Sequence, residues 1–236
     1  MLAGFAPRDG SIEFYSRINA LIEPRYTVLD LGAGRGAWYH EDSVPFRRTL
    51  RNFKGKVADY VGADVDPAVL DNPTTDRNVV IKDGLIPLPD NSVDLVFCDF
   101  VLEHVADVDK FKSELNRIVK PGGYFCGRTP HKNCYFSIGA RLVKNENHVR
   151  WLRKIQPKKK AQDTFPTTYR LNTLAAIRTV FSDWQNFSYI FTDRPAYYFG
   201  SKFVYDAMAV VHRIAPSWFT GCLFVFLKKP GAPQRS

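Results

Sequence analysis

Val-Leu-Asp-Leu-Gly-Ala-Gly-Arg-Gly, residues 28–36, is a short apolar run that leads into a glycine-rich turn. An uninterrupted apolar run of this kind is typical of a buried parallel strand. Glycine at positions 32, 34 and 36 lets the backbone turn tightly and leaves room for a ligand beside it. A helix after the turn would offer free N–H groups to an anion. The stretch therefore predicts a strand, a turn and a helix that bind a nucleotide-like ligand.

Strands and helices alternate on both sides of this turn. Short apolar runs predict strands at 27–31, 60–64, 79–81, 93–98 and 124–128, and two more at 187–191 and 221–227. Helical spacing of apolar residues predicts helices at 11–22, 37–52 with a break near Pro45, 110–119 and 172–181. This pattern favours an α/β protein with a doubly wound, mostly parallel sheet of seven strands. Ligands of such sheets bind outside the carboxyl ends of the strands.

Two carboxylates narrow the class of ligand. Asp30 stands two residues before the first glycine, where it would repel a pyrophosphate but attract an ammonium group. Asp64 ends the next predicted strand, where a carboxylate can accept hydrogen bonds from both hydroxyls of a ribose. A dinucleotide fingerprint has its third glycine one residue later and its acidic residue about 20 residues on, whereas Asp64 lies 28 residues past Gly36. A ligand with an amino acid at one end and an adenosine at the other fits this pattern better than NAD.

Over residues 25–130 the chain resembles the class I S-adenosylmethionine (SAM) dependent methyltransferases, especially the small-molecule branch that includes ubiquinone and menaquinone biosynthesis methyltransferases. Five segments carry the resemblance in order: VLDLGAGRG at 28–36, VGADVDP at 61–67, Asp83-Gly84, SVDLVFCDFVLEHV at 92–105 and LNRIVKPGGYF at 115–125. The connection at residues 37–59 is longer than the family pattern. The resemblance implies a Rossmann-like methyltransferase fold with an inserted lid region.

The resemblance also implies SAM as the cofactor. The backbone around Ala33 and Gly34 would hold the methionine part, with Asp30 nearby, while Asp64 would bind the ribose and Val65 would pack on the adenine. The implied cofactor-binding residues are Asp30, Gly32, Ala33, Gly34, Gly36, Asp64, Val65, Asp83, Gly84, Asp99 and Phe100. Methyl transfer from a sulfonium needs no metal, and none is expected.

A hydroxyl acceptor would also need a general base. His131 follows the fifth predicted strand and His104 follows the fourth, so both stand at the edge of the sheet where the ligand is expected. Histidine suits the role because its ordinary pKa lies near neutral pH. We predict both as catalytic candidates. The alternative for each is a histidine that only shapes the site or the loop around it.

Residues 129–170 form a basic, aromatic insert on the expected acceptor side. Residues 128–160 carry ten basic side chains and one acidic side chain, Glu146, within a chain of net charge +9. Such a patch indicates an anionic partner, unless it is only a solvated basic face. FPTTYRLNT at 165–173 resembles uncharacterised bacterial methyltransferases associated with surface polysaccharide synthesis, which implies a sugar acceptor, lipid-linked sugars included. We predict substrate-binding residues in this insert at His148, Arg150 and Tyr169.

We expect one domain over residues 1–236, with an N-terminal helix in 1–24, a cofactor-binding half at 25–128, the insert at 129–170 and the last helices and strands at 171–230. The first ten residues lack the apolar segment of a signal peptide. No uninterrupted apolar stretch reaches the length of a membrane span. We therefore expect a cytoplasmic protein, and leave contact with the inner face of the membrane and the oligomeric state open.

The sequence-based hypothesis is an enzyme that transfers a methyl group from SAM to a small-molecule or glycan acceptor, at oxygen. A nucleic-acid methyltransferase is one alternative, because the basic insert would permit it. However, residues 98–101 read Cys-Asp-Phe-Val where such enzymes carry an Asn/Asp/Ser-Pro-Pro-aromatic motif, so no nucleic-acid partner is expected. A non-catalytic SAM-binding interaction protein is the other alternative, but it would have no need of Asp30, the glycines and Asp64.

Overall fold

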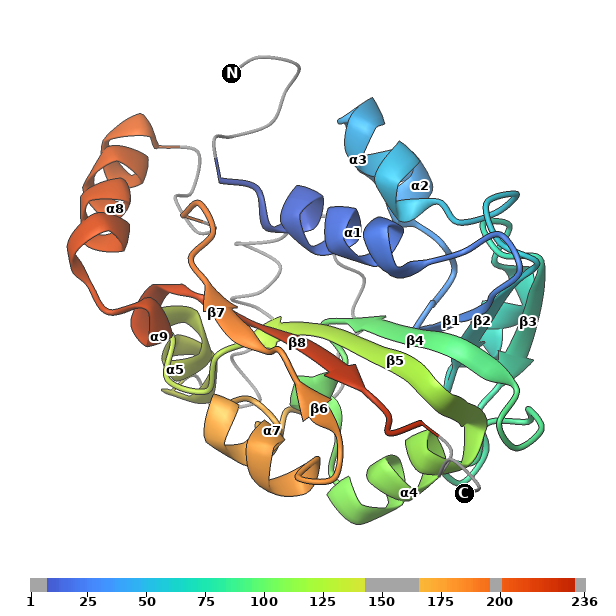
Figure 1. Cartoon of the computed structure of the whole chain (residues 1–236). Helices are drawn as coiled ribbons and strands as arrows, with labels where there is room; N and C mark the ends of the chain where they lie inside the picture. The colour runs from blue at the N-terminus through green and yellow to red at the C-terminus, as the bar shows by residue number, and fades with distance from the viewer. Residues whose placement is uncertain (1–7, 143–165, 196–200, 232–236) are drawn as a thin grey trace.

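The computed structural model describes residues 8–142, 166–195 and 201–231. Within these residues, a central sheet of eight strands has the order β3-β2-β1-β4-β5-β8-β6, and β7 also pairs with β8 (Figure 1). Strands β1 to β5 are parallel, and β8 runs antiparallel to β5. The strands are β1 (Thr27–Leu31), β2 (Asp59–Asp64), β3 (Arg77–Val80), β4 (Val93–Asp99), β5 (Val119–Pro130), β6 (Gln185–Asn186), β7 (Tyr189–Phe191) and β8 (Cys222–Lys228). The predicted α/β class and the mostly parallel sheet are confirmed.

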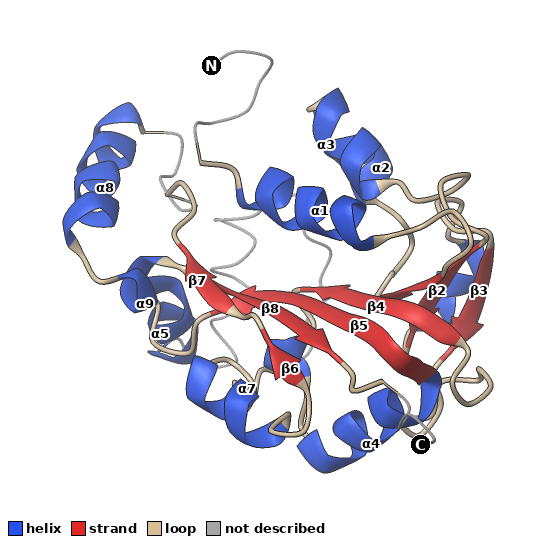
Figure 2. Ribbon diagram, in the orientation of Figure 1, coloured by secondary structure: helices blue, strands red, loops and turns tan. Residues whose placement is uncertain are grey.

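Helices cover both faces of the sheet and give three layers (Figure 2). One face carries α1 (Gly10–Leu21), α2 (Trp38–Glu41) and α3 (Pro45–Arg51). The other carries α4 (Val108–Ile118) and α7 (Leu174–Val180), with α5 (Tyr135–Leu142) beside them. The short 3-10 helices η2 (Pro67–Asp71) and η3 (Leu102–His104) follow β2 and β4. Two further helices, α8 (Lys202–Ile214) and α9 (Ser217–Thr220), precede β8.

Local sequence signals fix where several helices begin. The predicted break near Pro45 is confirmed, because Pro45 is the first residue of α3 and proline is tolerated at that position. Asp9 caps α1 by accepting hydrogen bonds from the backbone N–H groups of Ser11 and Ile12. Thr173 caps α7 in the same way, through the N–H of Ala176.

Alternate side chains of each strand point to opposite faces and form two buried cores. Val28 of β1 packs on the α1 side with Phe14 and Phe97, and all three are fully buried. Leu29, the next residue of β1, packs on the opposite side with Leu115 of α4. Burial on both faces explains why the strands read as continuous apolar runs in the sequence.

The outer edge of the sheet differs from the prediction. The sequence predicts one strand at 187–191, but β6 and β7 are separate, so the described sheet has eight strands and the predicted number of seven is wrong. The regular strand pairing with β8 is interrupted at Phe187 and Ser188, although the N–H of Phe187 still donates to the Phe226 carbonyl at 2.9 Å. There the N–H of Phe226 in β8 donates to the Ser188 hydroxyl at 3.2 Å, and the Asn186 side chain accepts from the N–H of Ser188 at 2.9 Å.

Part of the predicted acceptor-side insert lies outside the described residues, and this part includes His148 and Arg150. The described parts of the insert are the end of β5, α5 and the segment from residue 166 onward. Across the described ranges, none of the helices combines the length and the apolar character that crossing a bilayer requires.

Candidate active site

A cavity of about 980 Å³ opens at the carboxyl ends of β1, β2 and β4. The strand order reverses between β1 and β4, since β1 leads outward through β2 and β3 while β4 leads the other way through β5. Such a switch point is where open α/β sheets bind ligands. Of the residues predicted for the site, those that line the cavity are Gly32, Ala33, Gly34, Gly36, Asp64, Val65, Gly84, Asp99, Phe100 and His104.

The glycine-rich turn forms one wall of the cavity. Gly32 and Gly34 both have positive φ, at 83° and 53°, a backbone conformation that side chains disfavour. A side chain at Gly32 would collide with Val101, whereas one at Gly34 would meet no atom of the described residues within 4 Å. Gly34 therefore presents bare backbone to the open space of the cavity, where a ligand can approach it closely.

Two side chains hold this turn in place. The Asp64 carboxylate accepts a hydrogen bond from the N–H of Gly34 at 2.9 Å and another from the N–H of Asp66 at 2.9 Å. Buried Asn72 donates to the carbonyls of Ala33 and Gly34 at 3.2 and 3.0 Å. The sequence gives no signal for the role of Asn72, because the contact joins residues 38 and 39 positions apart.

Asp30 lies on β1, just before the glycine-rich turn, and does not line the cavity. Its carboxyl is buried and accepts a hydrogen bond from the Tyr60 hydroxyl at 3.2 Å. Burial raises the pKa of Asp30 to about 7, although Arg51 and the Tyr60 hydrogen bond act in the opposite direction. Asp30 is therefore close to its protonation midpoint near neutral pH, and a nearby ammonium group would favour its charged form.

Asp99 ends β4 and forms a buried ion pair with Arg128 of β5. Two Arg128 nitrogens, Nε and Nη2, each lie 2.6 Å from an Asp99 oxygen, and the Tyr15 hydroxyl donates to the same carboxylate at 3.0 Å. Burial acts to raise the pKa of Asp99, but Arg128 outweighs it and the pKa is lowered. The next residue, Phe100, has a φ of 61° and lies under the Arg128 guanidinium, 5.0 Å from ring centroid to Cζ. The ion pair thus fixes the end of β4 at the cavity.

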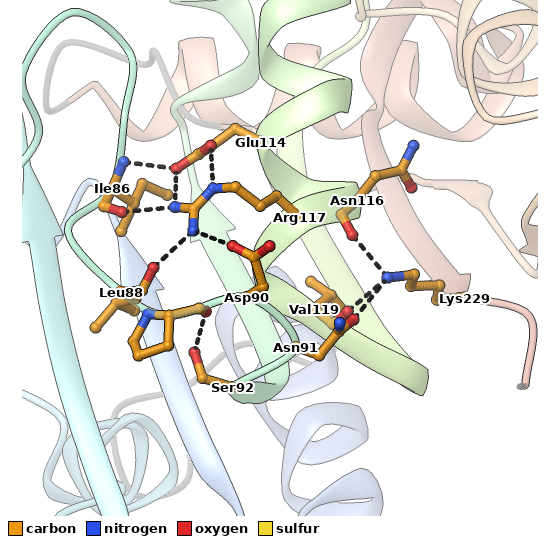
Figure 3. A network of polar contacts seen from close by, with 11 residues as sticks. Ile86, Leu88, Asp90, Asn91, Ser92, Glu114, Asn116, Arg117, Val119 and Lys229 are labelled. Carbon is orange, nitrogen blue, oxygen red and sulfur yellow. Dashed lines mark hydrogen bonds and ion pairs between the residues drawn. The ribbon is translucent and has the colours of Figure 1, made fainter.

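The loop after β3 supplies a further wall, and α4 holds it there. Gly84 and Ile86 line the cavity, whereas exposed Asp83 does not. Glu114 of α4 accepts from the N–H of Ile86 at 2.6 Å, and Arg117 donates to the carbonyls of Ile86 and Leu88 at 2.8 and 2.7 Å (Figure 3). Val65, after β2, lines the cavity with 54 % of its surface exposed.

The two histidines lie in different surroundings. His104 lines the cavity, and its Nδ1 lies 3.0 Å from the Pro166 carbonyl oxygen. His131 is buried and is absent from the cavity lining, and its Nδ1 accepts from the N–H of Asn133 at 3.2 Å. Burial lowers the pKa of His131. Of the two, His104 is the one with access to a molecule in the cavity.

A buried hydrogen-bond chain fixes the segment that follows residue 165. Thr129 donates to the Glu103 carboxylate at 2.8 Å, and Asn172 donates to the Thr129 hydroxyl at 2.6 Å. The N–H of Thr168 donates to the Glu103 carbonyl at 2.7 Å. These bonds place Pro166 and Thr168 in the cavity wall. Tyr169 has a φ of 52°, is buried and does not line the cavity.

Comparison with known proteins matches residues 29–127 to a family model described as "Methyltransferase domain". A probable SAM-dependent methyltransferase of Mycolicibacterium smegmatis is 43 % identical over 67 residues, which cover 28 % of this chain and 26 % of that protein. The demethylmenaquinone methyltransferase of Tropheryma whipplei is 29 % identical over 102 residues, which cover 41 % of this chain and 38 % of that protein. The chain thus spans about a quarter of the first relative's length and about two fifths of the second's.

Solved structures share the fold over nearly the whole chain. A Haloferax volcanii methyltransferase, solved in complex with the Trm112 methyltransferase activator, has a TM-score of 0.55 at 23 % identity and covers 94 % of this chain and 92 % of its own. YcgJ of Bacillus subtilis has a TM-score of 0.54 at 16 % identity, with coverages of 94 % and 99 %. The matched family segment contains the glycine-rich turn, Asp64 and Asp99, the residues that surround the cavity. Residues 29–127 thus match the methyltransferase-domain family model, and together with these relatives the match supports a class I SAM-dependent methyltransferase with S-adenosylmethionine as its cofactor.

Proposed function

We propose that this protein transfers a methyl group from SAM, bound in the cavity described above, to a small-molecule or glycan acceptor. The observation that carries the proposal is the joint position of Gly34 and Asp64 on one cavity at the switch point of the sheet. SAM supplies an electrophilic methyl group on its sulfonium when it is bound. The chain contributes by holding the donor and the acceptor in line, and good orientation of this kind contributes about 7–11 kcal/mol.

The chain's residues fit the cofactor at three points. Open space over Gly34 leaves room for a ligand against bare backbone. Asp64 ends β2, and its carboxylate retains acceptor capacity for ribose hydroxyls beyond its two backbone hydrogen bonds. Exposed Val65 beside it offers an apolar surface for the adenine. Asp30 lies on β1 and Asp99 is the last residue of β4. Both are acidic and would attract the ammonium group of the methionine part.

We propose that the acceptor atom is an oxygen and that His104 takes its proton. The support is that His104 lines the cavity and that its Nδ1 contacts the Pro166 carbonyl. When Nδ1 donates this bond, the neutral ring carries its lone pair on Nε2, the form that can act as a base. His131 remains a second candidate base, and Tyr169 a substrate contact, on the strength of the sequence alone.

We further propose a lipid-linked sugar as the acceptor, reached at the inner face of the membrane. The support comes from α8, which exposes Phe203, Val210 and Ile214 together with the basic residues Lys202 and Arg213. An apolar stripe with basic neighbours suits the surface of an anionic membrane. The basic insert at 128–160 would favour a pyrophosphate carrier.

Incubation with methyl-tritiated SAM and a bacterial extract tests the function. After the reaction, the extract is separated into aqueous metabolites, chloroform–methanol lipids, RNA and protein. We expect label in the lipid or metabolite fraction, lost when His104 is replaced by Ala if oxygen is the acceptor. Label in RNA would instead support the nucleic-acid alternative. Tight SAM binding without label in any fraction would support a non-catalytic protein.

A further inference from the structure

The long connection between β1 and β2 brings a tryptophan and an arginine into the cavity wall. Trp38 of α2 and Arg51 at the end of α3 both line the cavity. The Arg51 guanidinium carbon lies 4.8 Å from the centroid of the Trp38 ring and 5.4 Å from that of the Tyr15 ring. These cation–π contacts hold a positive charge at one end of the cavity.

Both side chains have a buried polar hydrogen without an acceptor. Within the described residues, the Trp38 Nε1 and the Arg51 Nε have no hydrogen-bond partner. By contrast, the Trp184 Nε1 donates to the Asn116 side chain at 2.9 Å. A buried donor that is left unsatisfied costs free energy, so such groups in a cavity wall often await a ligand or a water. Two unsatisfied donors, one of them on a guanidinium, together match a ligand with an anionic, oxygen-rich group.

The neighbouring carboxylates do not pair closely with Arg51. Asp99 is bound to Arg128, and Asp30 accepts from Tyr60. Both carboxylates nevertheless interact electrostatically with Arg51, which places the guanidinium on the β1 and β4 side of the cavity. Asp64 ends β2, on the other side of β1. The cavity therefore has a carboxylate for a ribose at one side and a cation at the other.

We propose that Arg51 and Trp38 bind the α-carboxylate of the methionine part of SAM. The inference rests on the proposed function, because it assigns one end of the same cofactor. Arg51 would bind the carboxylate through charge-assisted hydrogen bonds, and the Trp38 indole N–H would add a neutral one. Glu41 and Asp99 are acidic residues that also line the cavity, and they suit the neighbouring ammonium group. Recognition of an amino acid needs a cation for its carboxylate and an acidic group for its ammonium.

The test compares two ligands that differ in the carboxylate-bearing part. S-adenosylhomocysteine has the complete amino-acid moiety, whereas 5′-methylthioadenosine lacks it and retains the adenosine. Calorimetric titration of each ligand into Arg51→Met is expected to show binding of S-adenosylhomocysteine weakened about 30-fold. Binding of methylthioadenosine should change by less than about threefold. Trp38→Phe keeps an aromatic ring but removes the N–H, so we expect a loss of about three- to tenfold for S-adenosylhomocysteine alone.

Arg48→Met is the matched control, since Arg48 also lies on α3 but does not line the cavity and donates to the Asp42 carbonyl. It should leave both affinities unchanged. The inference would be overturned if Arg51→Met and Trp38→Phe weakened the binding of both ligands equally, or the binding of neither. Either result would leave the assignment of the cavity to the cofactor intact. If the folded wild type binds neither ligand, the proposed function fails, and this assignment fails with it.

Discussion

Replacement of Arg128 by Met is expected to destabilise the folded protein by about 3–5 kcal/mol, the usual cost of removing one partner of a buried ion pair. The carboxylate of Asp99 is only 5 % exposed and receives two Arg128 hydrogen bonds at 2.6 Å. Without Arg128, this charge would remain buried near the carboxyl of Asp30. The Tyr15 hydrogen bond and the charge of Arg51 would compensate only in part.

Urea denaturation followed by circular dichroism measures this loss. The double variant Asp99→Asn with Arg128→Met removes both charges, and it should be less destabilised than Arg128→Met alone. Arg77→Met is the control, because Arg77 pairs with Asp59 at the surface with 47 % of its side chain exposed. That pair should contribute no more than about 1 kcal/mol. Equal losses in Arg128→Met and Arg77→Met would show that the buried pair has no special role.

Replacement of Asp30 by Asn is expected to stabilise the ligand-free protein, and more so at alkaline pH. The pKa of Asp30 is raised from 3.8 to about 7 in the fold, chiefly by burial. Between these two values the folded state binds more protons than the unfolded state, so the stability of the wild type falls as pH rises toward 7. The amide of the variant does not titrate and escapes this loss. The gain in the free energy of unfolding should be on the order of 2–3 kcal/mol larger at pH 8 than at pH 5.

Urea denaturation of the wild type and Asp30→Asn at pH 5 and pH 8 checks how the free energy of unfolding of each protein changes with pH. The same difference in stability at both pH values would contradict a raised pKa for Asp30. The substitution should also weaken SAM binding, since it removes a negative charge near the expected ammonium group. A gain in stability with a loss of binding is the usual sign that a residue is kept for function rather than for folding.

The cofactor half of the fold follows from local signals in the sequence. The apolar runs around Val28 and Leu95 predict strands because both faces of the sheet are buried, and Pro45 predicts the break between α2 and α3. The split at Ser188 could not be predicted, because there the Ser188 hydroxyl accepts a hydrogen bond from the N–H of Phe226 in β8, a residue 38 positions away. The number of strands at the edge is therefore set by tertiary contacts.

The candidate site also combines residues that the sequence predicts with residues that only the folded structure reveals. The glycine-rich turn and Asp64 reach the cavity because strand ends determine their position. Asn72, Trp38 and Arg51 have no motif, and the folded chain alone brings them to the turn and the cavity wall. Asp30 is predicted only in part. Its place before the glycines can be read from the sequence, but its burial beside Tyr60 and its raised pKa depend on the folded structure.

Calorimetric titration of SAM and S-adenosylhomocysteine into the wild type, Asp64→Ala and Asp71→Ala tests the central claim most directly. We predict micromolar dissociation constants for the wild type, weakened at least tenfold, or by about 1.4 kcal/mol, in Asp64→Ala. Asp71→Ala removes an exposed carboxylate outside the cavity lining and should bind as the wild type does. A folded wild-type protein that binds neither ligand would contradict the assignment of this cavity to SAM.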